Sequence, residues 1–239
     1  MRTDDGSWTL VDPETQVAFH SGCGAVAETD HVYVNNGGIY ERLKAHPEFA
    51  VLEFGLGTGL GLIRTIDAFR KFTVSNPEEV DNVRLRYVAI DRDWLDANIL
   101  ESLAHQPADL SDDFIAQRRR WDTEASSPVC WEPIRGVSVE LWIDEANDAI
   151  QEIGRSGTTF DAVYYDAFDP ESNEDAWTAG VIRNIVPLMK RDARLVTYCI
   201  NRKVKELFRE CGLEPTAVPG PPGGKREVMV ARLVKQAQT

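Results

Sequence analysis

The chain has 239 residues, of which 43% are hydrophobic and 27% are charged, so it can bury the core of one large or two small domains. No apolar stretch approaches the roughly 20 residues of a membrane-spanning helix, and the acidic start lacks the apolar core of a signal peptide. We therefore expect a cytoplasmic protein without a membrane partner. The cysteines Cys23, Cys130, Cys199 and Cys211 form no Cys-x-x-Cys pair, which predicts neither a metal site nor a disulfide framework.

The charge of the chain is unevenly distributed. A net charge of -13 argues at first against a nucleic-acid partner. From Arg183 to the end, however, 12 Lys and Arg stand against 5 Asp and Glu, a net charge of +7, which leaves -20 for the remainder. A basic C-terminal quarter can hold a phosphate backbone locally, and a solvated surface is the alternative interpretation.

Strand patterns alternate with helix patterns along the chain. Polar and apolar alternation predicts short strands at 7–12 and 31–35, followed by a short helix at 37–46. Continuous apolar runs predict buried strands at 49–55, 85–93, 137–146, 160–170 and 193–200. Helical spacing predicts helices at 60–72, 94–122, 174–190 and 204–211, the last closed by Gly212. A Pro- and Gly-rich turn between 214–218 and 227–233 predicts a closing hairpin.

This alternation predicts an α/β, Rossmann-like fold with a mostly parallel seven-stranded sheet and an antiparallel terminal hairpin. We expect residues 1–46 to form an N-terminal β extension packed on a main domain at 47–239, which carries a helical insert at about 94–135. Ligands of such sheets bind beyond the carboxyl ends of the strands, at the point where the strand order reverses. Acidic residues that follow the predicted strands are therefore candidates for a binding site.

The stretch VLEFGLGTGLG at 51–61 places glycine at every second position directly after the first buried strand. The dinucleotide fingerprint requires glycine at position 60, where this chain has Leu60. A pyrophosphate prefers amide donors and a helix N-terminus, and the carboxylate of Glu53 would repel it. S-adenosylmethionine carries an ammonium and a sulfonium group and no phosphate, so its cationic end suits Glu53. The loop residues that would let its amino-acid portion approach the backbone are Gly55, Gly57, Thr58 and Gly59.

Acids after the next strands complete this predicted cofactor site. Asp91 ends the second buried strand, where a carboxylate can accept hydrogen bonds from both ribose hydroxyls. Asp144 or Glu145 ends the third and can accept from the adenine amino group. Any one of these acids could instead cap a helix, and a nucleotide-sugar or NAD site is the alternative.

Four blocks of the sequence resemble the MnmC/MnmD-type tRNA methyltransferases. Residues 164–177, YYDAFDPESNEDAW, resemble that family's Asp-x-Phe-x-Pro signature with its following Trp. The block at 5–34, the glycine stretch at 51–61 and the end at 197–231, which contains PGPPGGKREVMVA, are also similar to family blocks. Residues 73–140 resemble the family only weakly.

The resemblance implies transfer of a methyl group from S-adenosylmethionine to the 5-aminomethyl group of a (2-thio)uridine at the tRNA wobble position. It implies an anticodon stem-loop as partner and a functional link to an enzyme that makes the aminomethyl group. Because the chain ends soon after the hairpin, it resembles the stand-alone form without the FAD-dependent oxidase domain. The resemblance also implies that His20 and Ser21 fold over the cofactor and that Lys225, Arg226 and Glu227 lie near the anticodon.

Asp166, at the end of the fourth buried strand, is the candidate catalytic residue. We expect it to accept a hydrogen bond from the substrate amine and orient it, although such a residue can also cap a turn. Phe168 and Pro170 would form an apolar wall against the base, and Trp177 belongs either to this wall or to the core. The rival functions are methylation of a small-molecule amine and a non-catalytic member that only binds cofactor or RNA.

Overall fold

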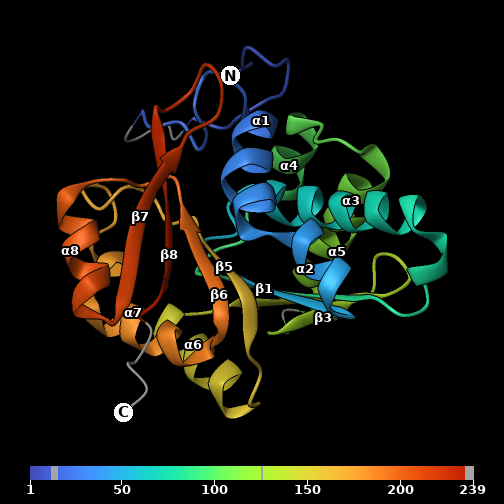
Figure 1. Cartoon of the computed structure of the whole chain (residues 1–239). Helices are drawn as coiled ribbons and strands as arrows, with labels where there is room; N and C mark the ends of the chain where they lie inside the picture. Colours follow the sequence, from blue (N-terminus) through green and yellow to red (C-terminus); the bar gives the residue numbers. More distant parts are fainter. Residues whose placement is uncertain (12–15, 125, 235–239) are drawn as a thin grey trace.

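The computed structural model, which describes residues 1–11, 16–124 and 126–234, contains a central eight-stranded sheet (Figure 1). Its strand order is β3-β4-β2-β1-β5-β6-β8-β7. The strands from β4 to β6 pair in parallel, whereas β3 is antiparallel to β4, and β8 is antiparallel to both β6 and β7. The strands are β1 (Glu48–Phe54), β2 (Arg84–Asp91), β3 (Val129–Trp131), β4 (Val137–Ile143), β5 (Phe160–Tyr165), β6 (Met189–Thr197), β7 (Leu213–Pro219) and β8 (Glu227–Leu233).

Helices cover both faces of the sheet, and each face has its own apolar core (Figure 1). One face is covered by η1 (Asp30–Asn35), α2 (Ile39–Ala45), α3 (Leu60–Ser75), α4 (Ala97–Leu103) and α5 (Ala108–Glu124), with α1 (Ala25–Thr29) preceding η1. The other face is covered by α6 (Ala146–Arg155), α7 (Ala179–Ile185) and α8 (Arg202–Glu210). Short 3-10 turns are η2 (Pro77–Glu79), η3 (Glu174–Trp177) and η4 (Val186–Leu188). None of the described helices is both long and apolar enough to cross a membrane.

The predicted α/β fold is confirmed, with differences in detail. The sheet has eight strands and not seven, because three residues within the expected helical insert form the edge strand β3. The helix expected at 174–190 is wrong in extent: its α-helical part is α7 alone, capped by the Thr178 hydroxyl, which accepts a hydrogen bond from the Val181 amide at 3.3 Å. Pro187 cannot donate a backbone hydrogen bond, and the chain tightens there into η4 before β6.

The N-terminal region is helical where a strand was expected. Residues 31–35 lie within η1, a π-helix, and the prediction of a strand there is wrong. Val32, Tyr33 and Val34 are all buried, because η1 is enclosed between α3 and β6, so the apparent alternation did not separate a buried face from an exposed one. The β structure described in residues 1–46 is limited to two isolated bridges, Arg2 with Trp8 and Val11 with Ala18. Residue 12 of the strand expected at 7–12 lies outside the described residues, and the domain boundary at residue 46 stays a prediction.

Candidate functional site

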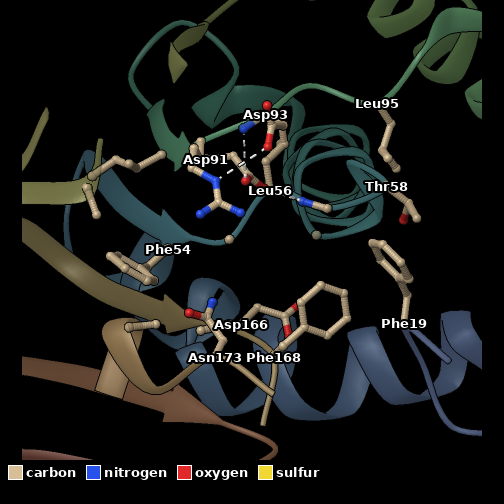
Figure 2. Close-up of a pocket in the computed structure, with 18 of the residues that line it drawn as sticks. Phe19, Phe54, Leu56, Thr58, Asp91, Asp93, Leu95, Asp166, Phe168 and Asn173 are labelled. Carbon is tan, nitrogen blue, oxygen red and sulfur yellow. Dashed lines mark hydrogen bonds and ion pairs between the residues drawn. The ribbon is translucent and has the colours of Figure 1, made fainter. Parts of the chain in front are cut away.

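A cavity of about 400 Å³ lies at the carboxyl ends of the central parallel strands (Figure 2). The chain leaves β1 toward β2 on one side, while β5 lies on the other side, so this is the point where the strand order reverses. Each strand end supplies a segment of the wall: 55–58 after β1, 91–93 at β2, 145–147 after β4 and 166–168 after β5. Figure 2 shows Asp91 and Asp93 across the cavity from Asp166, Phe168 and Asn173.

The wall of the cavity is strongly acidic. Its carboxylates belong to Asp91, Asp93, Glu145, Asp166 and Asp175. Arg92 is the one Lys or Arg among the residues described in the wall. Such a surface attracts a cationic ligand and repels a phosphate group. The arrangement therefore favours the predicted phosphate-free, positively charged nucleoside over a dinucleotide.

The glycine loop packs closely against the ends of β2 and β5. The Gly57 amide donates a hydrogen bond of 3.0 Å to Oδ2 of Asp91. Burial raises the pKa of Asp91, and backbone amides around its carboxyl group partly offset that effect. Gly55 has φ +94°, and a Cβ built there would lie 2.7 Å from the carbonyl oxygen of Asp166. This contact requires glycine, because a side chain would both strain the backbone and push the ends of β1 and β5 apart.

Glu53 lies beneath the glycine loop and does not line the cavity. The residue is 1% exposed, and its Oε1 would lie 2.1 Å from a Cβ built on Gly61 at the start of α3. No described residue makes a hydrogen bond to Oε2, which is buried. Burial raises the pKa of Glu53 well above its usual value, and the nearby charge of Asp166 raises it further.

The structure separates the other predicted cofactor residues into two groups. Thr58 and Glu145 line the cavity, together with Asp91 and the glycines 55 and 57. Gly59 packs at the start of α3 instead, where an added Cβ would meet the Phe114 ring at 2.4 Å. Asp144 also lies outside the wall, since its amide donates to the Asp91 carbonyl at 3.0 Å and its carboxylate accepts from the Glu145 amide at 2.7 Å. Of the two acids after β4, only Glu145 faces the cavity.

Asp166 faces the cavity from the end of β5 and is bound from behind by a tyrosine. The Tyr33 hydroxyl donates a hydrogen bond to Oδ1 of Asp166. Burial raises the pKa of Asp166 to about 8; the bond from Tyr33 lowers it, and the charges of Glu28 and Asp91 raise it. The carboxyl group thus changes its protonation state near neutral pH, which suits a group that accepts a proton from an amine.

Aromatic rings close one side of the cavity. The rings of Phe19 and Phe168 meet edge to face with their centroids 4.8 Å apart. The Trp177 indole donates a hydrogen bond of 2.6 Å to the Phe168 carbonyl, and its ring is buried against Tyr165. Trp177 therefore belongs to the core and supports Phe168 from behind. Pro170 does not line the cavity.

The two polar residues expected over the cofactor differ in position. His20 lines the cavity, and its Nδ1 lies 3.0 Å from the Thr9 hydroxyl. Burial lowers the pKa of His20 to about 4, so the ring is neutral at physiological pH. Ser21 is turned away: its amide donates to Glu28 Oε2 at 2.7 Å, and its hydroxyl lies 2.9 Å from the Cys23 sulfur.

Of the three residues expected at the anticodon, only Lys225 contacts a residue of the cavity wall. The Lys225 ammonium is 4.3 Å from the centre of the Tyr198 ring, and Tyr198 itself lines the cavity. Arg226 and Glu227 are exposed beside it, at the start of β8. Neither of these two residues reaches the cavity wall.

Several lining residues were not predicted as site residues: Phe19, Phe54, Leu56, Asp93, Leu95, Asn173, Asp175 and Tyr198. Asp93 carried a usable signal, because it follows the same strand end as Asp91. No sequence pattern indicated the hydrogen bond from Tyr33 to Asp166, because the two partners are 133 positions apart in the sequence.

The sheet order and the acidic cavity at its switch point define a Rossmann-like methyltransferase fold. Residues 116–234, about half of the chain, match a family model described as S-adenosyl-L-methionine-dependent methyltransferase. The chain is 28% identical over 95% of its length to the tRNA 5-methylaminomethyl-2-thiouridine biosynthesis bifunctional protein MnmC of Burkholderia multivorans, of which it covers 33%. It is 27% identical over 89% of its length to the protein of the same name from Ralstonia nicotianae, of which it covers 31%.

Among solved structures, that of MNMC2 from Aquifex aeolicus superposes with a TM-score of 0.77 and 22% identity, covering 97% of this chain and 69% of that one. This likeness shows a shared fold. The family match and these relatives support an S-adenosyl-L-methionine-dependent, MnmC-type methyltransferase domain. It spans about a third of the length of the bifunctional relatives it matches.

Proposed function

We propose that the chain binds S-adenosylmethionine and methylates the 5-aminomethyl group of a (2-thio)uridine at the tRNA wobble position, giving 5-methylaminomethyl-(2-thio)uridine. The name of the bifunctional relatives supports the substrate. The observation that carries the proposal is the placement of Asp166. Its Oδ1 is held by Tyr33, and among the described residues none donates a hydrogen bond to Oδ2, which leaves that oxygen for a substrate amine.

The residues of the cavity fit the cationic cofactor. The acidic wall favours positive charge. We assign the backbone of 55–58 to the amino-acid portion, Asp91 to the ribose hydroxyls and Glu145 to the adenine amino group. His20 would cover the bound nucleoside as a neutral ring. When bound, the cofactor supplies a methyl group on cationic sulfur, which is already activated toward a nucleophile.

The chain's own residues then have to align the amine and exclude water. Asp166 accepts a hydrogen bond from the amine nitrogen, which orients the lone pair, and its carboxylate receives the proton that the nitrogen releases. A pKa of about 8 lets Asp166 act in this way near neutral pH. Phe19 and Phe168 form an apolar wall that keeps water away from the amine and offers a face to the uracil ring.

The charge of the C-terminal quarter suits contact with a tRNA anticodon stem-loop better than the acidic charge of the rest of the protein does. Lys225 lies against Tyr198 of the cavity wall, Arg226 follows it and is exposed, and the chain from Arg183 onward has 12 Lys and Arg against 5 Asp and Glu. Basic side chains there would contact phosphates, which position an RNA without reading its sequence. The substrate requires another enzyme that makes the aminomethyl group, and we place the reaction in the cytoplasm, where such an enzyme and tRNA meet.

The test is methylation of tRNA purified from a strain that lacks this modification, followed by mass spectrometry of the nucleosides. We expect 5-methylaminomethyluridine or its 2-thio form with the wild-type protein. Asp166→Ala should abolish the product and leave the affinity for S-adenosylhomocysteine within a few-fold of wild type. Loss of cofactor affinity with an unchanged rate per bound complex would contradict the role of Asp166.

A small-molecule amine is the second candidate, because the net charge of -13 disfavours RNA over most of the surface. An assay of methyl transfer from labelled cofactor to a mixture of primary amines, run beside the tRNA assay, decides between the two acceptors. Methylation of free amines at rates that unmodified tRNA cannot match would favour this candidate. Binding of the cofactor without transfer to either acceptor would indicate a non-catalytic member.

A further inference from the structure

Asp166 is bound by a residue from a distant part of the chain. The Tyr33 hydroxyl in η1 donates to Oδ1, and the Tyr33 side chain is buried, with the residue 2% exposed. Its ring packs against Tyr164 with centroids 5.5 Å apart. Tyr33 thus approaches Asp166 from behind the cavity wall, on the face of the sheet that η1 covers. It does not itself line the cavity.

Several contacts fix η1 in place and so fix the direction of this hydroxyl. Arg64 of α3 donates two hydrogen bonds of 2.7 Å to the carboxylate of Asp30 at the start of η1. Just after η1, the Asn36 carbonyl accepts a hydrogen bond of 3.2 Å from Arg194 of β6. Gly37 approaches the Tyr164 ring so closely that an added Cβ would lie 2.7 Å from it. A π-helix is a rare conformation that is often found at functional sites.

The groups that face Asp166 come from several elements. Glu28 lies in α1, Asp91 ends β2, Tyr198 follows β6, and Lys225 lies in the turn between β7 and β8. Glu53 of β1 also interacts electrostatically with Asp166. The acids disfavour an ionised Asp166, while Lys225 and the hydrogen bond from Tyr33 favour it. Of the two favourable groups, Tyr33 is the one in direct hydrogen-bond contact.

We propose that Tyr33 is the positioning residue of the methyl transfer: its hydroxyl holds Oδ1, favours the ionised carboxyl group and turns Oδ2 toward the substrate amine. The inference rests on the proposed function. Tyr33 keeps its own proton throughout, because burial raises its pKa well above the usual value and the charge of Asp166 raises it further. The proton released by the amine therefore goes to Oδ2 of Asp166, and Tyr33 only donates a hydrogen bond.

The experiment compares Tyr33→Phe with Tyr164→Phe. Both changes remove one phenolic oxygen from the same buried layer, but the Tyr164 hydroxyl contacts Thr65 at 3.4 Å and not Asp166. The first readout is the pH dependence of kcat/KM for tRNA methylation. The second is the titration of Asp166 in the ligand-free protein, followed by NMR with 13C-labelled aspartate, in which Asp166→Asn identifies the signal.

We expect Tyr33→Phe to raise the pKa of Asp166 by about one to two units, because a hydrogen bond to a charged group contributes about that much. The rising limb of the rate profile should shift by the same amount, with a loss of about 10-fold to 100-fold at pH 7. Tyr164→Phe should change neither readout. A Tyr33→Phe protein in which the limb and the Asp166 titration both stay at the wild-type pH overturns the proposal.

A second variant covers the case in which Tyr33→Phe does not fold. Replacing Tyr33 with 3-fluorotyrosine keeps the ring and makes the hydroxyl a stronger donor, so the pKa of Asp166 should fall. An unchanged or higher pKa overturns the proposal. If the wild-type protein does not methylate tRNA, the proposed function fails by itself. The ligand-free titration then still decides whether Tyr33 controls the ionisation of Asp166.

Discussion

Gly55→Ala is the substitution that most directly tests how the cavity is built. Gly55 is the first residue after β1, and it has φ +94°. An added Cβ would lie 2.7 Å from the Asp166 carbonyl oxygen and 3.0 Å from its carbon. Both obstacles are backbone atoms, so no side-chain rotation can relieve the contact. The ends of β1 and β5, which carry the glycine loop and Asp166, would have to separate.

Two effects set how much Gly55→Ala lowers the free energy of unfolding. A non-glycine residue in a sparsely populated backbone conformation costs about 1–3 kcal/mol. Overpacking against a rigid neighbour costs about another 1–3 kcal/mol. We therefore expect the free energy of unfolding to fall by about 2–6 kcal/mol. The affinity for S-adenosylhomocysteine should fall as well, because the loop moves.

Gly212→Ala is the matched control for the first effect. Gly212 follows α8 with φ +85°, and an added Cβ would meet nothing within 4 Å. Urea unfolding of both variants separates backbone strain, which they share, from the contact with Asp166, which only Gly55→Ala creates. Calorimetry with S-adenosylhomocysteine should show weaker binding for Gly55→Ala alone. Equal losses of stability in the two variants, with wild-type affinity in both, would refute the role assigned to this contact.

The remaining predictions concern the charge and the rings of the same site and Lys225 beside it. Because the pKa of Asp166 is raised from 3.8 to about 8, its contribution to stability is complete below about pH 4 and is lost as the pH rises through 8. In urea unfolding across this range, the free energy of unfolding of Asp166→Asn should rise relative to that of the wild type, by at most about 1.4 kcal/mol per pH unit. Phe19→Leu removes an edge-to-face ring pair from the wall assigned to the uracil ring and should raise the KM for tRNA about 2-fold to 10-fold in the methylation assay. Lys225→Gln should weaken tRNA binding and reduce the slope of its logarithmic salt dependence by about 1, whereas an unchanged slope would exclude a phosphate contact.

The strands and the acids at their ends could be predicted because each depends on a local pattern. β1 and β5 are buried on both faces, so continuous apolar runs mark them in the sequence. The carboxyl ends of parallel strands meet at one edge of the sheet, which brings Asp91, Glu145 and Asp166 to one cavity.

Glu53 shows where the same argument becomes inaccurate. Side chains along a strand alternate between the two faces of the sheet. Val51 belongs to the core beneath α3, and Leu52 and Phe54 belong to the opposite core. Glu53 therefore points to the side of Val51, under the first turn of α3, and not out of the strand end. Its place in the sequence predicted an acid near the loop, but the alternation puts it below the loop.

The N-terminal region could not be predicted because its conformation depends on long-range contacts. Residues 31–35 alternate like a strand, yet their neighbours are α3 and β6, which approach from both sides. The bond from Tyr33 to Asp166 spans 133 positions and exists only once those elements have packed. The edge strand β3 has three residues and one partner strand, too short for a periodic signal.

The electrostatics of the site connect its stability to its ligand. Glu53, Asp91 and Asp166 all have raised pKa values, mainly because burial disfavours their charged forms. Glu53 and Asp166 also oppose each other's ionisation directly. In the ligand-free protein these groups reduce stability as the pH rises. A cationic nucleoside in the cavity beside Asp91 and Asp166 would favour their charged forms and lower their pKa values, whereas a phosphate would add to the repulsion. Asp91 and Asp166 therefore reduce the stability of the ligand-free protein and also make the cavity selective for positive charge.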